Sequence, residues 1–362
     1  MKQTRLKHLD FMRGIAILNV LIIHQGLATL GFPAFNILYR LCIPVFVFVT
    51  GLTIVYSIDR PYIENLLKKI SYMVNMTFIY LVIIYLIYDK TIPLMTIFTD
   101  LLSGKVPEDK NAAMWYFPFY IGLYFVVWSE IKFVKMMYEL VLKKLCGFSK
   151  VWYYILLAIV SVVIIFVGQN LNVDLDYTSV NNPFFIKNAL VMQGFAVSGH
   201  IVSCISQNTD EIKNIFKNFL PKFADLGYEI TKIFILIIST ILFFKLAQKY
   251  GFVDVRPLIY QSVQSFYIST MCGLISLYLL SKYICDIFNN FFVVNYICYC
   301  GRRSLHICGL HLVLIIFLQK YLVYIQTIFA MTNGHALIQL IVQSVVLSLI
   351  SIFISYAIER EK

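Results

Sequence analysis

Apolar residues form runs of about 20 residues along almost the whole chain, and short polar stretches separate these runs. An α-helix of about 20 apolar residues is long enough to cross the hydrocarbon layer of a bilayer. The pattern therefore predicts an all-α integral membrane protein, a bundle of about ten transmembrane helices. We expect these helices at 12–30, 37–57, 68–88, 112–129, 151–168, 184–206, 229–247, 264–283, 303–324 and 335–357.

The pattern is weakest at 112–129, which is short and contains Pro118. The stretch that follows, 132–146, predicts either a loop or an amphipathic helix in the membrane interface. At the amino terminus, Arg13 and His24 interrupt an apolar run that otherwise resembles a signal peptide, and no small-residue cleavage site follows it. We therefore expect a first helix that is retained.

The composition supports the membrane class. Of the 362 residues, 60% are hydrophobic and 14% are charged, with a mean hydropathy of +0.79. A soluble protein has about a quarter of its residues charged, so a soluble fold of this length could not cover its surface. No linker rich in Pro or Ser and no obvious repeat divides the sequence. We expect one transmembrane domain over 1–362, without a soluble accessory domain.

The net charge of +11 comes mostly from Lys and Arg in the polar stretches between the apolar runs. With the amino terminus placed in the cytoplasm, 20 of the 30 Lys and Arg residues fall on the cytoplasmic side and 5 fall in outer loops. Cytoplasmic loops are the more positive ones in membrane proteins, so both termini are predicted to be cytoplasmic. A nucleic-acid partner is not expected, because the basic residues do not gather on one face among stacking aromatic residues.

Two ionisable residues in the first apolar run are candidates for function, because such groups are costly at membrane depth. Arg13 and His24 are 11 residues apart, which places them about 20° apart around a helix and about 16 Å apart along it. This geometry suits a long anionic ligand that enters from the cytoplasm, with its phosphates on Arg13 and its reactive end near His24. The alternative is a snorkelling arginine and a packing histidine. Asp10 is predicted as a salt-bridge partner or as a first-turn carboxylate.

The cysteines and the other histidines do not predict a metal site. The eight cysteines lie mostly in or beside apolar runs and include no C-x-x-C pair, so we expect buried thiols. His306 and His311 are five residues apart, which places them about 140° apart around a helix. They cannot form an i, i+4 zinc pair, and we expect no metal. His200 is interpreted as a structural residue.

Four short motifs occur in order along the chain. They are LDFMRGIAI followed by His24, RLCIPVFVFVTG from Arg40 to Gly51, WYFP from Trp115, and GRRSLHICGLH ending at His311. In order and spacing they resemble the motifs of the acyltransferase-3 family of membrane acyltransferases. That family has an arginine or lysine, ten residues and a histidine in its first helix, then Arg with Pro-x-Phe-Phe-x-x-Ser-Gly, a Trp-Tyr/Phe-Leu element and Gly-x-x-Ser-Leu-x-Ile-Tyr-x-x-His. The departures from these patterns include Val47, Thr50 and Cys308.

The resemblance implies transfer of an acyl group, usually acetyl from acetyl-CoA, to a hydroxyl of a cell-surface or lipid-linked glycan. His24 would then be the catalytic residue, either as a general base or as an acylated carrier. Arg13 would hold the phosphates of CoA, and His311 would orient the reacting groups or act as a core histidine. Acyl-CoA would be a substrate, and no permanently bound cofactor is expected. The richness in Lys, Ile, Asn and Tyr is typical of an AT-rich bacterial genome, so we expect a bacterial plasma membrane.

Three further residues are candidates for substrate binding. Arg40 lies near the outer end of the second predicted helix, where it would meet a glycan phosphate or carboxylate, line the route across the membrane, or bind lipid headgroups. Trp115 and Tyr116 would stack on sugar, or belong to an aromatic girdle at the membrane interface.

Two other functions were weighed against acyl transfer. A polysaccharide exporter or flippase would need a polar lumen with charged side chains on several helices, and this sequence has few intramembrane charges. A glycan polymerase would be expected to have a long outer loop rich in Arg, and the predicted outer loop 89–111 contains none. Acyl transfer is therefore the favoured prediction, with export as the alternative.

Overall fold

The structure is a computed structural model, and it describes residues 6–25, 33–58, 115–144, 149–173, 183–207, 224–317 and 336–360, apart from 252 and 256, together with isolated positions between 64 and 95. These ranges are helical, with Asp254 and Ile259 forming an isolated β-bridge. The α-helices are α1 (Lys7–His24), α2 (Pro33–Ile54), α5 (Tyr116–Met137), α6 (Lys150–Asn170), α7 (Ile186–Gln207), α9 (Ala224–Tyr250), α10 (Val263–Ile287), α11 (Phe292–Arg302), α12 (Ser304–Phe317) and α14 (Ala336–Arg360).

The predicted all-α membrane class is confirmed. In the described ranges, five helices are long and apolar enough to cross a membrane, namely α5 with its extension, α6, α7, α9 and α10. Shorter apolar helical segments occur at Tyr39–Ile54 and Ile341–Ile354. The helix predicted at 68–88 and the loop predicted at 89–111 lie outside the continuously described residues. The sidedness of the bundle stays a prediction from the charge count.

Two boundaries differ from the prediction. The helix expected to end at 129 continues through α5 and then as a π-helix, η3 (Tyr138–Lys143), so 132–146 is for the most part a direct continuation of it. Pro118 does not weaken α5, because it lies in the first turn, where a missing N–H costs nothing. The first helix ends at His24 rather than at 30, with Gln25 as its C-cap. His24 is therefore at the end of α1 rather than within it.

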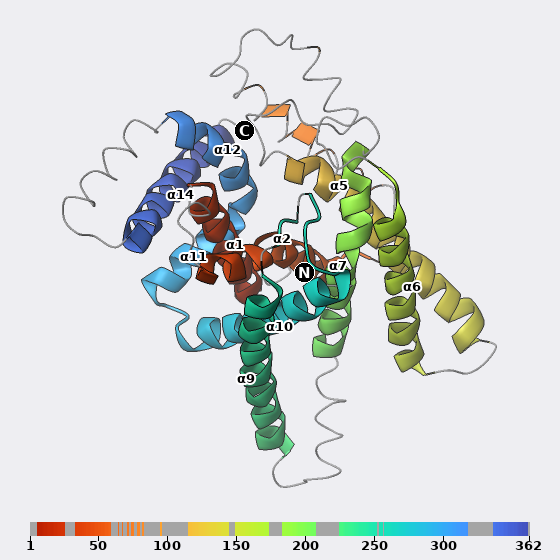
Figure 1. The fold of residues 1–362 in the computed structure, drawn as a ribbon. Coiled ribbons are helices and arrows are strands. Elements are labelled where there is room, and N and C mark those ends of the chain that lie inside the picture. Colours follow the sequence, from red (N-terminus) through yellow and green to blue (C-terminus); the bar gives the residue numbers. More distant parts are fainter. Residues whose placement is uncertain are drawn as a thin grey trace.

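Helix α11 was not predicted. Its 11 residues are too few for a membrane span, so it falls below the length on which the prediction rests. It connects α10 to α12 and packs along α1. Figure 1 shows α11, α12 and α14 on one side of α1 and α2, with α5, α6 and α7 on the other side.

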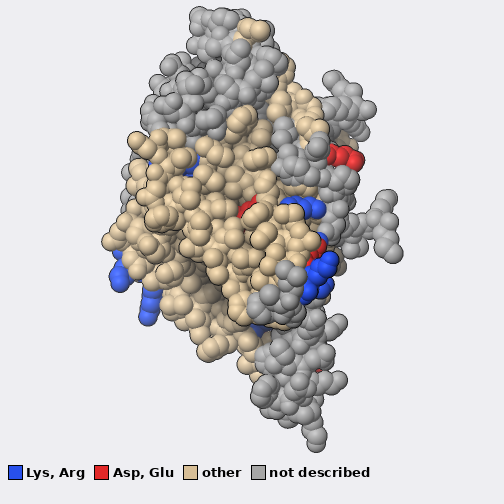
Figure 2. Space-filling model, turned by 90° about the vertical axis from the view of Figure 1, so that its right-hand side faces the viewer, with Lys and Arg blue, Asp and Glu red and all other residues tan. Residues whose placement is uncertain are grey.

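The helices differ in how much of their surface is covered. The apolar stretches of α5 and α7 are 67% and 61% buried, whereas those of α6 and α9 are 22% and 17% buried. The exposed faces of α6 and α9 carry large apolar residues such as Phe166 and Phe234. On the face drawn in Figure 2, charged side chains are few and most of the described surface is neither acidic nor basic. This surface suits contact with lipid.

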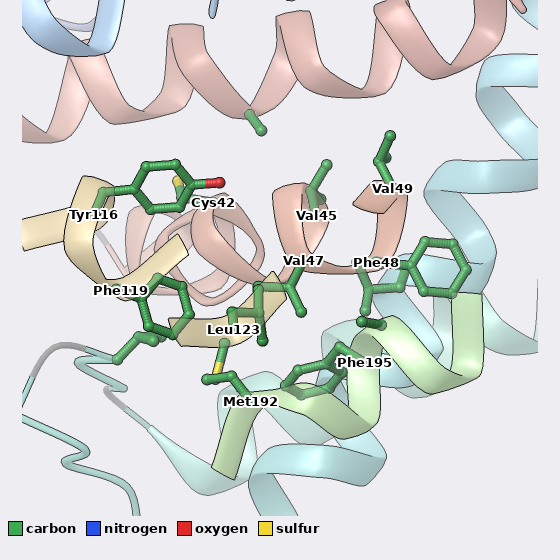
Figure 3. Close-up of a cluster of buried hydrophobic side chains, with 14 of the residues drawn as sticks. Cys42, Val45, Val47, Phe48, Val49, Tyr116, Phe119, Leu123, Met192 and Phe195 are labelled. Carbon is green, nitrogen blue, oxygen red and sulfur yellow. The ribbon is translucent and has the colours of Figure 1, made fainter. Parts of the chain in front are cut away.

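The core is formed where α2, α5 and α7 meet. Val47 of α2, Leu123 of α5 and Phe195 of α7 are completely buried and converge in one cluster (Figure 3). Small residues allow the backbones to approach closely at this contact. A Cβ atom on Gly51 would lie 1.7 Å from the Ala196 carbonyl oxygen. Glycine is therefore required for α2 and α7 to pack as they do.

A second close contact joins α1 to α11. A Cβ atom on Gly14 would lie 2.0 Å from the carbonyl oxygen of Ile297, and one on Gly301 would lie 1.7 Å from that of Asp10. Both glycines belong to motifs at opposite ends of the sequence. Their packing fixes the position of the late motif against the first helix.

Candidate active site

The structure brings together two histidines from the first and the last motif. The imidazole rings of His24 on α1 and His311 on α12 have centroids 5.0 Å apart and planes inclined by 48°. The pair lies where α1 contacts α12 and α14. Two groups of this kind at one point of a membrane bundle can move a proton or accept an acyl group.

The orientation of His311 follows from its hydrogen bonds. Its ring is fully buried, and Nδ1 lies 2.7 Å from the Cys308 carbonyl oxygen and 3.2 Å from that of Ile307. Because a carbonyl only accepts, a neutral His311 carries its hydrogen on Nδ1 and a lone pair on Nε2. Nε2 is buried and has no hydrogen-bond partner among the described residues. That nitrogen is thus available to a bound ligand.

His24 differs from His311 because its side chain is exposed. It is the last residue of α1, and the next residue, Gln25, donates a 2.8 Å hydrogen bond to the Ser344 hydroxyl of α14. This bond attaches the end of α1 to α14. The helix end holds the accessible imidazole next to the buried one.

Arg13 lies along α1 from this pair, about 16 Å away at 1.5 Å per residue. Its guanidinium is 3.8 Å from the carboxylate of Asp10, and the Arg13 side chain is 27% exposed whereas that of Asp10 is buried. The predicted ion pair of Asp10 is confirmed. Since the pair is long and partly exposed, the guanidinium keeps edges that can bind an anion.

Tyr116 connects the second and third motifs. Its side chain is buried, and its ring contacts Phe46 of α2 and Tyr120 of α5, at centroid distances of 5.7 and 5.8 Å. Tyr116 is thereby fixed against the second motif.

Trp115 has a different environment. Its ring is buried against Phe119 and Phe185, at centroid distances of 5.1 and 5.6 Å. These contacts connect the start of α5 to η4 (Pro183–Phe185), the 3-10 turn before α7. The structure therefore gives Trp115 packing contacts, and sugar stacking by this residue stays a prediction.

Arg40 is at another contact, between α2, α9 and α10. It is completely buried and donates hydrogen bonds to the Ser269 hydroxyl and to the Gly251 carbonyl oxygen. Gly251 has a φ of +61° and follows the last residue of α9, where a helix presents unpaired carbonyls and a partial negative charge. Arg40 thus caps α9. A role in binding substrate stays a prediction.

Two buried polar features are not predicted by the sequence analysis. The hydroxyls of Thr50 and Tyr120 are 3.1 Å apart, which joins the second motif to α5. Glu130 is buried, and neither carboxylate oxygen has a hydrogen-bond partner in the described part of the chain. It was overlooked because the helix was expected to end at 129. An acidic residue inside an apolar run was the available signal.

The remaining polar candidates behave as structural residues. His200 Nε2 lies 3.1 Å from the Tyr153 hydroxyl, which agrees with its structural interpretation. None of the seven cysteines that the structure describes forms a disulfide. Within the described residues, no three His, Cys, Asp or Glu side chains converge as a metal site. The expected absence of zinc stays a prediction.

Comparison with known proteins agrees with this convergence of motifs. Residues 6–360 match the acyltransferase-3 family, whose members share an acyltransferase domain. No curated protein and no solved structure gives a significant match. The match covers nearly the whole chain, including all four motifs and every helix around the histidine pair. The chain is therefore a member of the acyltransferase-3 family, a multi-pass membrane acyltransferase.

Proposed function

We propose that the protein transfers an acyl group, in the first instance acetyl, from cytoplasmic acyl-CoA to a hydroxyl of a cell-surface or lipid-linked glycan in a bacterial plasma membrane. The observation that carries this proposal is the pair of His24 and His311, one exposed and one buried with a fixed tautomer. The family supports acyl transfer. The acyl-CoA donor and the glycan acceptor are inferred from the family resemblance, and the position of Arg13 near the predicted cytoplasmic end of α1 suits the phosphates of CoA.

In the proposed reaction the acceptor hydroxyl attacks the thioester carbonyl, the C–O bond forms and the C–S bond breaks. His24 takes the hydroxyl proton, and this proton passes to the sulfur of the departing CoA. In the second possible route the thioester first acylates the His24 imidazole, which then passes the acyl group to the hydroxyl. Both routes give the same products, the acylated glycan and free CoA.

His311 has a positioning role in either route. With its Nδ1 hydrogen held by backbone carbonyls, its Nε2 can accept a hydrogen bond from the acceptor hydroxyl or from the neighbouring imidazole. Burial keeps the ring in one orientation. The attacking group is thereby aligned before the acyl group arrives.

On the acceptor side, we propose that Tyr116 contacts the glycan, since it belongs to the third motif and its ring packs against Phe46 of the second motif. In this proposal Trp115 and Arg40 do not contact the substrate and instead stabilise the surrounding helices. Trp115 fixes the start of α5 against α7 through Phe185, and Arg40 fixes the end of α9. Their replacement would alter the shape of the site.

The test is to measure glycan-bound acetate in cells that carry the wild-type chain, His24→Ala or Arg13→Ala, with membrane levels checked by immunoblot. We expect loss of acetate from both variants. With purified protein, the His24→Ala change should lower the transfer rate by about 100-fold or more, the usual contribution of a general acid–base residue. A control is His200→Gln, since His200 lies at the contact between α6 and α7.

Two results would reject the proposal. Unchanged acetylation in variants present at normal levels would exclude His24 and Arg13 from the reaction. Loss of surface glycan, rather than loss of its acetate, would favour the alternative of an exporter or flippase.

Mass spectrometry of rapidly quenched protein would separate the two chemical routes, because only the second leaves an acyl group on His24.

A further inference from the structure

The unpredicted helix α11 places a second arginine beside the Arg13 end of α1. Gly301 packs directly on the first helix, since a Cβ atom there would lie 1.7 Å from Asp10 O and 2.8 Å from Gly14 N. These two residues flank the turn that carries Arg13. Arg302, the next residue after Gly301 and the last of α11, is therefore adjacent to the same turn of α1.

The side chain of Arg302 is held in a defined position. Its guanidinium lies 5.0 Å from the centroid of the Tyr299 ring, one turn earlier on α11, and the arginine is exposed. Stacking on an aromatic ring covers the face of a guanidinium and leaves its N–H edges free to bind an anion. A fork of this kind matches the geometry of a phosphate.

Other contacts join the start of α1 to α11. The Cys298 thiol donates a 3.6 Å hydrogen bond to the Lys7 carbonyl oxygen. The Lys7 ammonium is hydrogen-bonded to Asn289 and to the side chain of Asn295, at 2.7 Å to each side-chain oxygen. The contact between α1 and α11 therefore carries Lys7, Arg13 and Arg302, and the buried Asp10 carboxylate pairs with Arg13.

We propose that Arg302, held by Tyr299, binds the phosphates at the nucleotide end of the acyl-CoA donor together with Arg13. This inference rests on the proposed function, and it extends the donor site from α1 to α11. The pantetheine arm then runs along the face of α1 from Arg13 towards His24. The contact through Gly14 and Gly301 has a function here, because it holds the end of α11 against the turn of α1 that carries Arg13.

A phosphate could also come from a lipid headgroup, since Arg302 is exposed and α11 carries exposed apolar residues such as Phe292 at its other end. The experiment must separate these two sources. A donor that lacks the nucleotide, acetyl-pantetheine, would still react at His24 but would have nothing to bind at Arg302. Lipid binding at Arg302 would affect both donors alike.

The test is to measure KM and kcat for acetyl-CoA and for acetyl-pantetheine with purified wild-type protein, Arg302→Gln and Arg302→Lys. For Arg302→Gln, we expect KM for acetyl-CoA to rise about tenfold, equivalent to about 1.4 kcal/mol, with no change in KM for acetyl-pantetheine. Arg302→Lys should recover part of the loss because it keeps the charge. Lys144→Ala removes another exposed cation, just after η3, and should alter neither value.

The outcomes distinguish this inference from the proposed function. If wild-type protein transfers no acetyl group from either donor, the proposed function fails. If wild-type protein is active but Arg302→Gln raises KM equally for both donors, or for neither, Arg302 does not bind the nucleotide phosphates and the inference is wrong. A KM that depends on the anionic lipid content of the vesicles, equally for both donors, would assign Arg302 to lipid and would also overturn the inference.

Discussion

Replacing Gly301 by alanine tests whether the contact between α1 and α11 supports the site. Two effects of this change oppose each other. Inside a helix, alanine is preferred to glycine by about 0.5–1 kcal/mol. Against this, the new Cβ would meet the Asp10 carbonyl oxygen at 1.7 Å and its carbon at 2.7 Å. These are backbone atoms, so no side-chain rotation relieves the collision.

Overpacking of this kind typically costs about 1–3 kcal/mol, and a clash with backbone belongs at the upper end. We therefore expect a net loss of about 2 kcal/mol. The midpoint of thermal unfolding should fall by a few °C, because about 1 kcal/mol corresponds to roughly 2–4 °C for domains of 150–250 residues and to less in longer chains. Fluorescence-detected size exclusion after heating would measure this shift.

The matched control is Gly194→Ala in α7. Its Cβ would first meet Ile165 Cδ1 and the Tyr267 hydroxyl at 2.9 Å, which are the far ends of side chains. Ile165 can shift, whereas Tyr267 is held by its hydrogen bond to Val191 O and by stacking on Phe195, so the change should cost less than Gly301→Ala, where backbone is struck. A Gly301→Ala protein as stable as wild type, or no less stable than Gly194→Ala, would refute the reasoning. Activity should fall with Gly301→Ala, since the clash displaces the turn of Arg13.

Three further predictions concern other contacts. His311→Gln should lower the rate of acyl transfer on the order of 100-fold through misplacement of the reacting groups, with thermal stability close to wild type, and steady-state kinetics with a melting curve would check both. Arg40→Met removes the hydrogen bonds to Ser269 and Gly251 and should lower the free energy of unfolding by about 1.5–3 kcal/mol. An unchanged melting temperature would show that Arg40 does not cap α9. Thr50→Val should cost about 1 kcal/mol by removing the bond to Tyr120, whereas Thr50→Ser keeps the hydroxyl and should melt like wild type.

The sequence alone was sufficient to predict most of the helices, because a membrane helix satisfies its hydrogen bonds within one segment. The apolar length of that segment then decides whether it can span the bilayer. The runs at 151–168 and 264–283 predicted α6 and α10 closely. The pattern does not predict α11, since 11 residues are too few for the run of about 20 that marks a membrane span.

The chemistry of the site could be predicted only in part. The arginine and the histidine of the first motif were recognised because intramembrane charges are costly, and the family motifs pointed to His311. The role of Arg40 could not be predicted, because a buried arginine bonded to a helix end has the same sequence signature as one that binds a ligand. Its partners belong to α9 and α10, far along the chain.

The sequence by itself determined the membrane class, most of the helices and the four motifs, since each depends on residues that are close along the chain. Only the tertiary structure decided that His24 lies next to His311 and that Gly301 packs the end of α11 against the turn of α1 that carries Arg13. The physical reason is that helices associate through the steric fit of surfaces from distant segments. The Gly14 and Gly301 contact depends on two backbones that approach where neither carries a side chain, and no local pattern specifies that partner.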